Sequence, residues 1–136
     1  MNVKVFFDTN VLIYAIALND PRSQRAAELL EAGGVVSVQI LNEFVSVARR
    51  QLKMPWKETR TALEAFRVLC RDVMPLTVET HDAALKIAEV YRYEFYDALV
   101  AASALEAKCA ILYSEDLQNG QRIEESLLVR NPFTDR

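Results

Sequence analysis

Residues 3–8 read Val-Lys-Val-Phe-Phe-Asp, an apolar run that ends abruptly at a carboxylate. Apart from Lys4 the run is continuously apolar, which is typical of a central strand buried on both faces of a parallel sheet. A residue that directly follows such a strand lies at its carboxyl end, where ligands bind in open α/β sheets. This stretch therefore predicts a parallel-sheet fold with Asp8 in the functional crevice.

Outside this stretch, strand-like runs rich in Val, Ile and Leu alternate with longer segments of helical periodicity. Strands are expected over residues 35–37, 73–76 and 110–113, with a short edge strand at 127–129. Alternation of strands and helices indicates an α/β fold in which helices cover both faces of the sheet. A chain of 136 residues with 51% hydrophobic composition can build one core, so we expect a single domain over residues 1–136.

The composition is that of an ordinary globular chain with a slight negative charge. There are 16 Lys and Arg residues against 19 Asp and Glu residues, so no overall positive field indicates a nucleic-acid partner. The two cysteines, Cys70 and Cys109, are expected to be reduced, which favours a cytoplasmic location. The longest apolar run, residues 11–18, is too short to span a bilayer, and no signal peptide is expected.

Three further acids are expected to lie near Asp8. Asp116 follows the strand at 110–113, Asp97 opens a helix, and Glu43 projects from the helix that comes after the second strand. Short connections would carry all four acids to the carboxyl edge of the sheet. Taken singly, Asp97 is also explained as a helix N-terminal carboxylate, Asp116 as a turn cap, and Glu43 as a surface residue paired with arginines.

Four carboxylates in one small volume indicate a metal site. Close carboxylates repel one another and raise one another's pKa, and a hard divalent cation such as Mg²⁺ or Mn²⁺ relieves this repulsion. Zinc is disfavoured, because His81 is the single histidine and the cysteines lack metal-binding spacing. Such a cation supports phosphodiester hydrolysis by activated water, with Asp8, Asp97 and Asp116 as ligands and Glu43 as ligand or orienter of the water.

Several segments carry a resemblance to a known family. They are Phe7-Asp8-Thr9-Asn10-Val11-Leu12-Ile13-Tyr14, Ser37-Val38-Gln39-Ile40-Leu41-Asn42-Glu43-Phe44, residues 96–104 from Tyr96-Asp97-Ala98 onward, and Tyr113-Ser114-Glu115-Asp116-Leu117-Gln118. In these segments the chain resembles PIN-domain nucleases, especially VapC-type toxins. The resemblance places the family's acids on Asp8, Glu43, Asp97 and Asp116, and its polar supporting positions on Asn10 and Ser114. Glu115 offers a further carboxylate, which would share the metal or point to solvent.

The resemblance extends over essentially the whole chain and implies several properties that spacing alone does not. It implies a three-layer α/β/α sandwich on a parallel five-stranded sheet. It also implies a ribonuclease that depends on Mg²⁺ or Mn²⁺, homodimerisation and a cognate antitoxin.

A cationic stretch between residues 44 and 71 offers a place for the RNA backbone. It holds seven cations, among them Arg49, Arg50 and Lys53, against two acids. A solvated helix face or a dimer contact would explain the same count. Four aromatic residues could stack on bases, namely Trp56, Tyr91, Tyr93 and Tyr96. Aromatics at helical spacing are more typical of a core or an interface, which is the interpretation favoured here.

Other classes of protein fit the acids less well. A phosphatase of the haloacid-dehalogenase kind needs a second acid two positions after Asp8, where this chain has Asn10. A receiver-like signalling domain has no need of acids at Glu43 and Asp97. A catalytically silent module of the same fold, binding RNA or a basic protein segment, remains open, because only an activity assay separates it from a nuclease.

Overall fold

The apolar run before Asp8 forms β1 (Val5–Phe7), which lies inside a six-stranded sheet in the computed structural model of the chain. The structure describes residues 3–134. The other strands are β2 (Val35–Ser37), β3 (Asp72–Met74), β4 (Ile111–Tyr113), β5 (Arg122–Ile123) and β6 (Leu127–Arg130). Their order in the sheet is β3-β2-β1-β4-β6-β5, and every neighbouring pair is parallel except β5 and β6.

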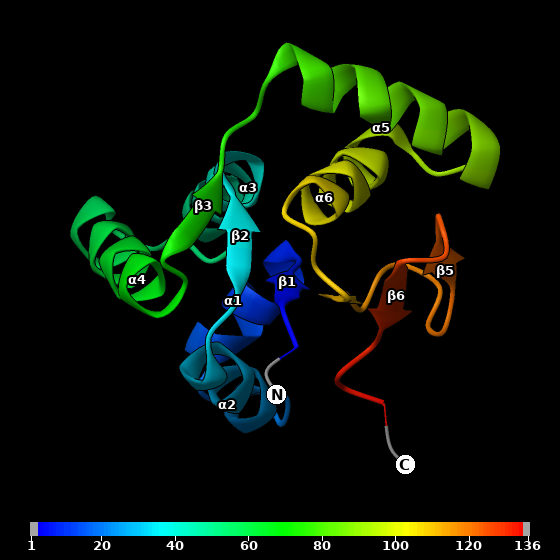
Figure 1. Cartoon of the computed structure of the whole chain (residues 1–136). Coiled ribbons are helices and arrows are strands. Elements are labelled where there is room, and N and C mark those ends of the chain that lie inside the picture. The colour runs from blue at the N-terminus through cyan, green and yellow to red at the C-terminus, as the bar shows by residue number, and fades with distance from the viewer. Residues whose placement is uncertain (1–2, 135–136) are drawn as a thin grey trace.

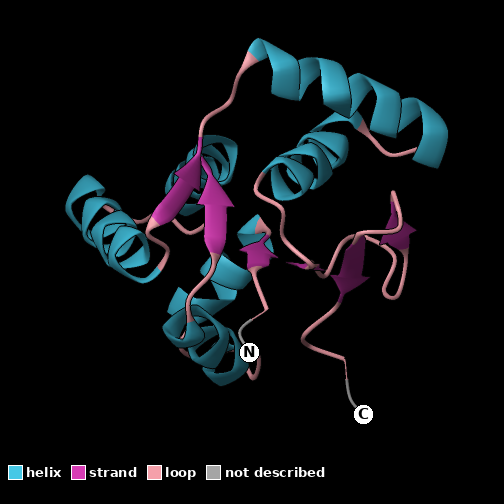
Figure 2. Ribbon diagram, viewed as in Figure 1, coloured by secondary structure: helices cyan, strands magenta, loops and turns pink. Residues whose placement is uncertain are grey.

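Helices connect the strands and form a layer on each face of the sheet (Figures 1 and 2). They are α1 (Thr9–Ile16), α2 (Ser23–Ala32), α3 (Val38–Arg50), α4 (Trp56–Leu69), α5 (Val78–Tyr91) and α6 (Phe95–Glu106). Helices α1 to α4 pack against one another on one side, while α5 and α6 pack together on the other (Figure 1). The predicted α/β class and three-layer sandwich are therefore confirmed.

The prediction of five strands, with residues 127–129 at the sheet edge, was wrong. β6 lies between β4 and β5, so the antiparallel β5 forms the edge. A three-residue turn joins β5 to β6, and its first two residues, Glu124 and Glu125, have φ of 52° and 63°. Hairpin turns of positive φ are normally signalled by Gly or Asn. Two glutamates give no such signal, so the sequence did not reveal the hairpin.

Close packing around β1 fixes the centre of the fold. Phe6 and Phe7 are fully buried, as the continuous apolar run predicted. Gly34, just before β2, lies against the Phe7 ring, and a Cβ on Gly34 would be 2.4 Å from Phe7 Cε2. Only glycine allows this approach without displacing the ring. The buried alanines of α6 similarly let that helix lie close to the sheet.

None of the helices within residues 3–134 is long and apolar enough to cross a membrane.

Candidate active site

The topology of the sheet creates a crevice at its carboxyl edge. β1 pairs with β2 on one side and with β4 on the other. The connection from β1 to β2 therefore runs over one face of the sheet, and the connection from β3 back to β4 runs over the opposite face. Such a switch in strand order opens a ligand crevice beyond the strand ends. Asp8 follows β1 and Asp116 follows β4, and both lie in this crevice.

All four predicted acids line one pocket of about 380 Å³. Glu43 reaches it from the second turn of α3 and Asp97 from the first turn of α6. The remaining lining residues are Thr9, Asn10, Ile13, Tyr14, Ser46 and Val47. The lining includes no lysine, arginine or histidine, so nothing in the pocket wall neutralises the carboxylates.

Asp8 is the most constrained of the four acids. It is only 5% exposed and occupies the N-cap of α1, where its Oδ1 accepts a hydrogen bond from the Thr9 amide at 2.7 Å. Its Oδ2 accepts one from the Ser114 hydroxyl, also at 2.7 Å. Burial raises the pKa of Asp8 to about 6, and the nearby Asp116 and Glu43 add to the rise although the two hydrogen bonds oppose it. A cation in the pocket would favour the ionised form.

Ser114 connects Asp8 to the segment that carries Asp116. Its buried hydroxyl donates to Asp8 and accepts from the amides of Asp116 and Leu117, at 3.2 and 3.3 Å. Ser114 thus caps the turn that it begins. The Asp116 carboxylate accepts no hydrogen bond from a backbone amide of the described residues, so the alternative in which it caps the turn leading to Gly120 is wrong. That carboxylate instead accepts a hydrogen bond from the side-chain amide of Asn10 at 3.4 Å. Both predicted supporting residues therefore contact predicted acids.

Glu43 is oriented by two neutral groups. Its Oε1 accepts a hydrogen bond from the Thr9 hydroxyl at 2.6 Å, and its Oε2 accepts one from the side-chain amide of Gln39 at 3.4 Å. Within residues 3–134 it forms no ion pair, so the alternative in which Glu43 pairs with arginines is wrong. Thr9 contacts both Asp8 and Glu43, a role that sequence analysis missed although the residue stands inside the first motif.

Asp97 stands in the first turn of α6, and no backbone amide of the described chain is capped by it. Desolvation raises the pKa of Asp97, and Asp116, Glu94 and Glu43 raise it further. Among the described residues, no three acids, histidines or cysteines gather closely enough to hold a metal ion. The four acids share a pocket without forming a closed coordination shell.

Glu115 is held outside this pocket by a cluster of its own, which we call the Arg22 cluster (Tyr14, Asp20, Arg22 and Glu115). Arg22 pairs with Glu115 at 3.0 Å and with Asp20 at 2.8 Å, and its guanidinium lies 3.8 Å from the centre of the Tyr14 ring. The Tyr14 hydroxyl donates to Glu115. Burial and this hydrogen bond raise the pKa of Tyr14 to about 12. Glu115 is therefore engaged by an ion pair, and neither lines the pocket nor points freely to solvent.

The predicted RNA-binding cations separate in the structure. Arg49 donates to the Met54 carbonyl at 2.6 Å and lies over the Trp56 ring, 4.2 Å from its centre, so its side chain stabilises the end of α3. Arg50 lines a second hollow beside the acidic pocket, and Lys53 is exposed just after α3. His81 packs against Phe95 and is not among the residues that line the acidic pocket.

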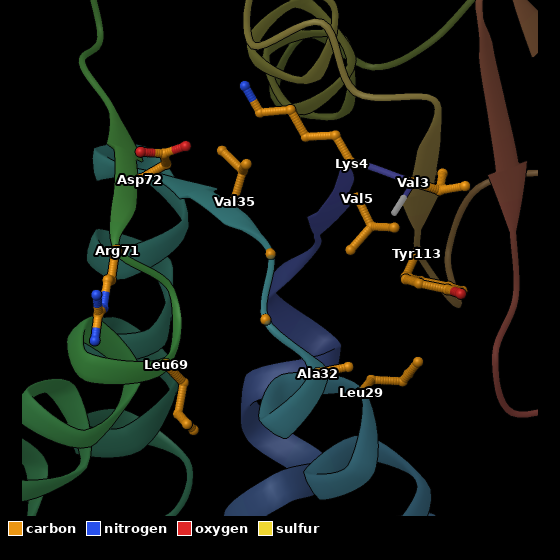
Figure 3. A pocket seen from close by; sticks show the side chains of 12 residues that line it. Val3, Lys4, Val5, Leu29, Ala32, Val35, Leu69, Arg71, Asp72 and Tyr113 are labelled. Carbon is orange, nitrogen blue, oxygen red and sulfur yellow. The ribbon is translucent and has the colours of Figure 1, made fainter. Parts of the chain in front are cut away.

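A larger hollow, of about 510 Å³, lies among the segments that lead into β1, β2 and β3 (Figure 3). Its lining includes Lys4, Arg71 and one acid, Asp72, around apolar side chains such as Val5 and Leu29. It contains no group of acids comparable with the four at the carboxyl edge. We therefore assign the candidate active site to the acidic pocket.

The fold and the pocket define an α/β protein with an acidic ligand site at the carboxyl edge of a mostly parallel sheet. The family model of the PIN domain matches residues 5–121. The chain therefore belongs to the PIN domain family. No curated protein gives a significant match.

Solved structures of similar fold include toxins and toxin–antitoxin complexes. A toxin–antitoxin complex from Klebsiella pneumoniae has a TM-score of 0.71 and 18% identity, covering 96% of this chain and 98% of that chain. DNA-bound VapBC from Salmonella typhimurium has a TM-score of 0.69 and 19% identity, covering 96% and 99%. Mycobacterium tuberculosis VapC20, described as a toxin that cleaves the sarcin–ricin loop, has a TM-score of 0.65 and 19% identity, covering 83% and 90%. At this level of identity the similarity shows the fold.

Proposed function

We propose that this PIN-domain chain is a Mg²⁺- or Mn²⁺-dependent endoribonuclease and the toxin of a toxin–antitoxin pair. The observation that carries the proposal is the convergence of four acids, from four separate segments of the chain, in one pocket without a neutralising cation. For Asp8 this arrangement is costly for the fold alone, because a buried carboxylate needs a partner when it ionises. A bound cation that takes part in a reaction would offset this cost and would explain why the four acids lie together.

The donor set of the pocket fits a hard divalent cation. Its charged donors are carboxylate oxygens, and its lining contains neither histidine nor cysteine, which zinc would prefer. Asp8, Asp97 and Asp116 would hold the ion, with Glu43 as a fourth ligand or as orienter of water. When bound, such a cation lowers the pKa of a water and neutralises charge on a phosphodiester.

The chain's own residues prepare the site for this chemistry. Ser114 and the Thr9 amide fix both oxygens of Asp8, and the Thr9 hydroxyl fixes one oxygen of Glu43. Asn10 positions Asp116. Hydrogen bonds of this kind keep ligand oxygens in place and lower the entropy lost on binding. The site is therefore partly preorganised before a substrate arrives.

Similar folds support RNA as the substrate and an antitoxin as the partner. VapC20 is described as a toxin that cleaves the sarcin–ricin loop, and other similar structures are toxin–antitoxin complexes. We infer that the partner inhibits by placing an arginine or lysine near Asp8, Asp97 and Asp116, because an anionic pocket that accepts metal ions also accepts a guanidinium. We further propose a homodimer, as the resemblance to VapC-type toxins implies.

Mapping of cleaved RNA ends tests the proposal. We expect cleavage in the presence of Mg²⁺ or Mn²⁺ with 5′-phosphate and 3′-hydroxyl ends, since water and not the ribose 2′-hydroxyl is the nucleophile. Asp8→Asn and Asp97→Asn should lower cleavage by more than about a hundredfold, above the range for groups that only support a ligand. Asp82→Asn, on the exposed surface of α5, is the matched control and should cleave normally.

Two results would contradict the nuclease proposal. Ends carrying a 2′,3′-cyclic phosphate would exclude the hydrolytic route. Metal-dependent RNA binding without cleavage by the wild-type chain would instead favour the catalytically silent binding module.

A further inference from the structure

Helix α3 carries a polar stripe on the face opposite its core residues Ile40, Phe44 and Ala48. Spacings of three and four residues place side chains on one side of a helix. The stripe consists of Gln39, Asn42, Glu43, Ser46 and Arg50. One of these residues, Glu43, belongs to the acidic pocket described above, and the others extend from it along the helix.

Tyr96 and the polar stripe together line a hollow of about 460 Å³, which we call the α3 hollow. Tyr96 comes from the first turn of α6, directly before Asp97, and is 62% exposed. Glu43 and Ser46 line both the α3 hollow and the acidic pocket, so the two adjoin. The volume lies within the range of small-ligand sites.

The polar groups of the α3 hollow are available for a ligand. Within residues 3–134, the side chains of Asn42, Ser46 and Arg50 form no hydrogen bond or ion pair, and Gln39 bonds only to Glu43. The neighbouring Arg49 differs, because its guanidinium donates to the Met54 carbonyl and lies over the Trp56 ring. Adjacent arginines thus have different roles, and only Arg50 is presented to the hollow.

This set of groups matches the chemistry of an unpaired nucleotide. An exposed aromatic ring stacks on a base that is not held in a duplex. A guanidinium pairs with a phosphate, and side-chain amides and hydroxyls bond to the edges of bases. In the α3 hollow these roles fall to Tyr96, Arg50 and Asn42. The position beside the acidic pocket is where a nucleotide next to the reacting phosphate would lie.

Resting on the ribonuclease function proposed above, we propose that the α3 hollow is a nucleotide subsite. One unpaired nucleotide flanking the scissile phosphate binds there, with its base on Tyr96 and its phosphate at Arg50. Asn42 contacts the base edge and so contributes a preference for one base at this position. The substrate is then RNA that is single-stranded at the cut.

Binding of a short single-stranded RNA tests the subsite. The probe is an octaribonucleotide with 2-aminopurine at successive positions, whose fluorescence falls when the base stacks. Every protein also carries Asp8→Asn, so that the RNA stays intact. We expect Tyr96→Leu to weaken binding by a factor of about 5 to 150 and to abolish the quenching at one position, whereas Tyr96→Phe retains both.

The phosphate contact is tested by the salt dependence of the same binding. Arg50→Gln should reduce the slope of log affinity against log salt by about 1. Arg67→Gln removes an equal charge from the exposed surface of α4, outside the hollow, and should leave the slope unchanged. Equal affinity for Tyr96→Leu and Tyr96→Phe, or equal slopes for Arg50→Gln and Arg67→Gln, would overturn the subsite.

Cleavage mapping separates this inference from the function on which it rests. In an otherwise wild-type chain, Asn42→Ala should relax the base preference beside the cut while cleavage continues. An unchanged preference with active enzyme would count against the subsite alone. Failure of the wild-type chain to cleave any RNA would contradict the proposed function, whereas failure of the Asp8→Asn chain to bind the probe would overturn the subsite alone.

Discussion

Glu115 and Asp116 are adjacent in the sequence, yet they belong to two differently built regions. The Glu115 carboxylate is paired with Arg22 and accepts a hydrogen bond from Tyr14. The Asp116 carboxylate faces a pocket with three other acids, and only the neutral Asn10 bonds to it. In the Arg22 cluster a guanidinium pairs with each carboxylate, whereas no cationic side chain of the described residues lines the acidic pocket. Several carboxylates that share a pocket without a counter-charge, and not a carboxylate as such, therefore indicate a metal site.

The largest expected effect concerns the stability of the metal-free protein. Because the pKa of Asp8 is raised from 3.8 to about 6, ionisation of this buried group opposes folding. The stability that protonated Asp8 contributes is fully present below pH 3.8 and is lost as the pH rises through about 6. By pH 7 the free energy of unfolding has fallen by about 3 kcal/mol for this reason. Unfolding in chelator should therefore show Asp8→Asn gaining stability relative to wild type over this range. If the unfolding free energies of Asp8→Asn and wild type changed in parallel with pH, ionisation of Asp8 would not destabilise the fold.

The next effect tests whether Ser114 supports the acidic pocket. Ser114→Ala removes the donor to Asp8 and the acceptor of two amides, which should cost about 1 to 3 kcal/mol of unfolding free energy. Metal affinity should fall by about 10- to 100-fold. The matched control is Ser103→Ala, because the buried Ser103 hydroxyl has no hydrogen-bond partner among the described residues. Denaturant unfolding that showed similar losses in the two variants would argue against a supporting role.

The smallest effect is expected in the Arg22 cluster. Arg22→Gln removes both ion pairs, but its side chain is 37% exposed, and exposed pairs contribute little. Metal affinity, measured by titration calorimetry, should change by less than about tenfold, below the range for groups bonded to a ligand. A larger loss would show that the Arg22 cluster acts on the acidic pocket, so that the two regions could not be treated as separate.

Much of the fold and the candidate site could be predicted because topology and local pattern determine them. The apolar run before Asp8 indicated a central parallel strand, and this placed acids from distant segments at one sheet edge. Contacts between particular side chains could not be predicted. The partner of Glu115 is Arg22, 93 positions away, and the different roles of Arg49 and Arg50 depend on where Met54 and Trp56 lie.

The central claim is that the four acids of the pocket, and not their paired neighbour, bind a divalent cation. Calorimetric titration of the full chain with Mn²⁺ compares Asp116→Asn with Glu115→Gln, substitutions at adjacent positions that each remove one charge. We predict that Asp116→Asn loses more than about a hundredfold in affinity and that Glu115→Gln stays within about tenfold of wild type. Equal losses in the two variants, or wild-type affinity in Asp116→Asn, would contradict the assignment of the metal site.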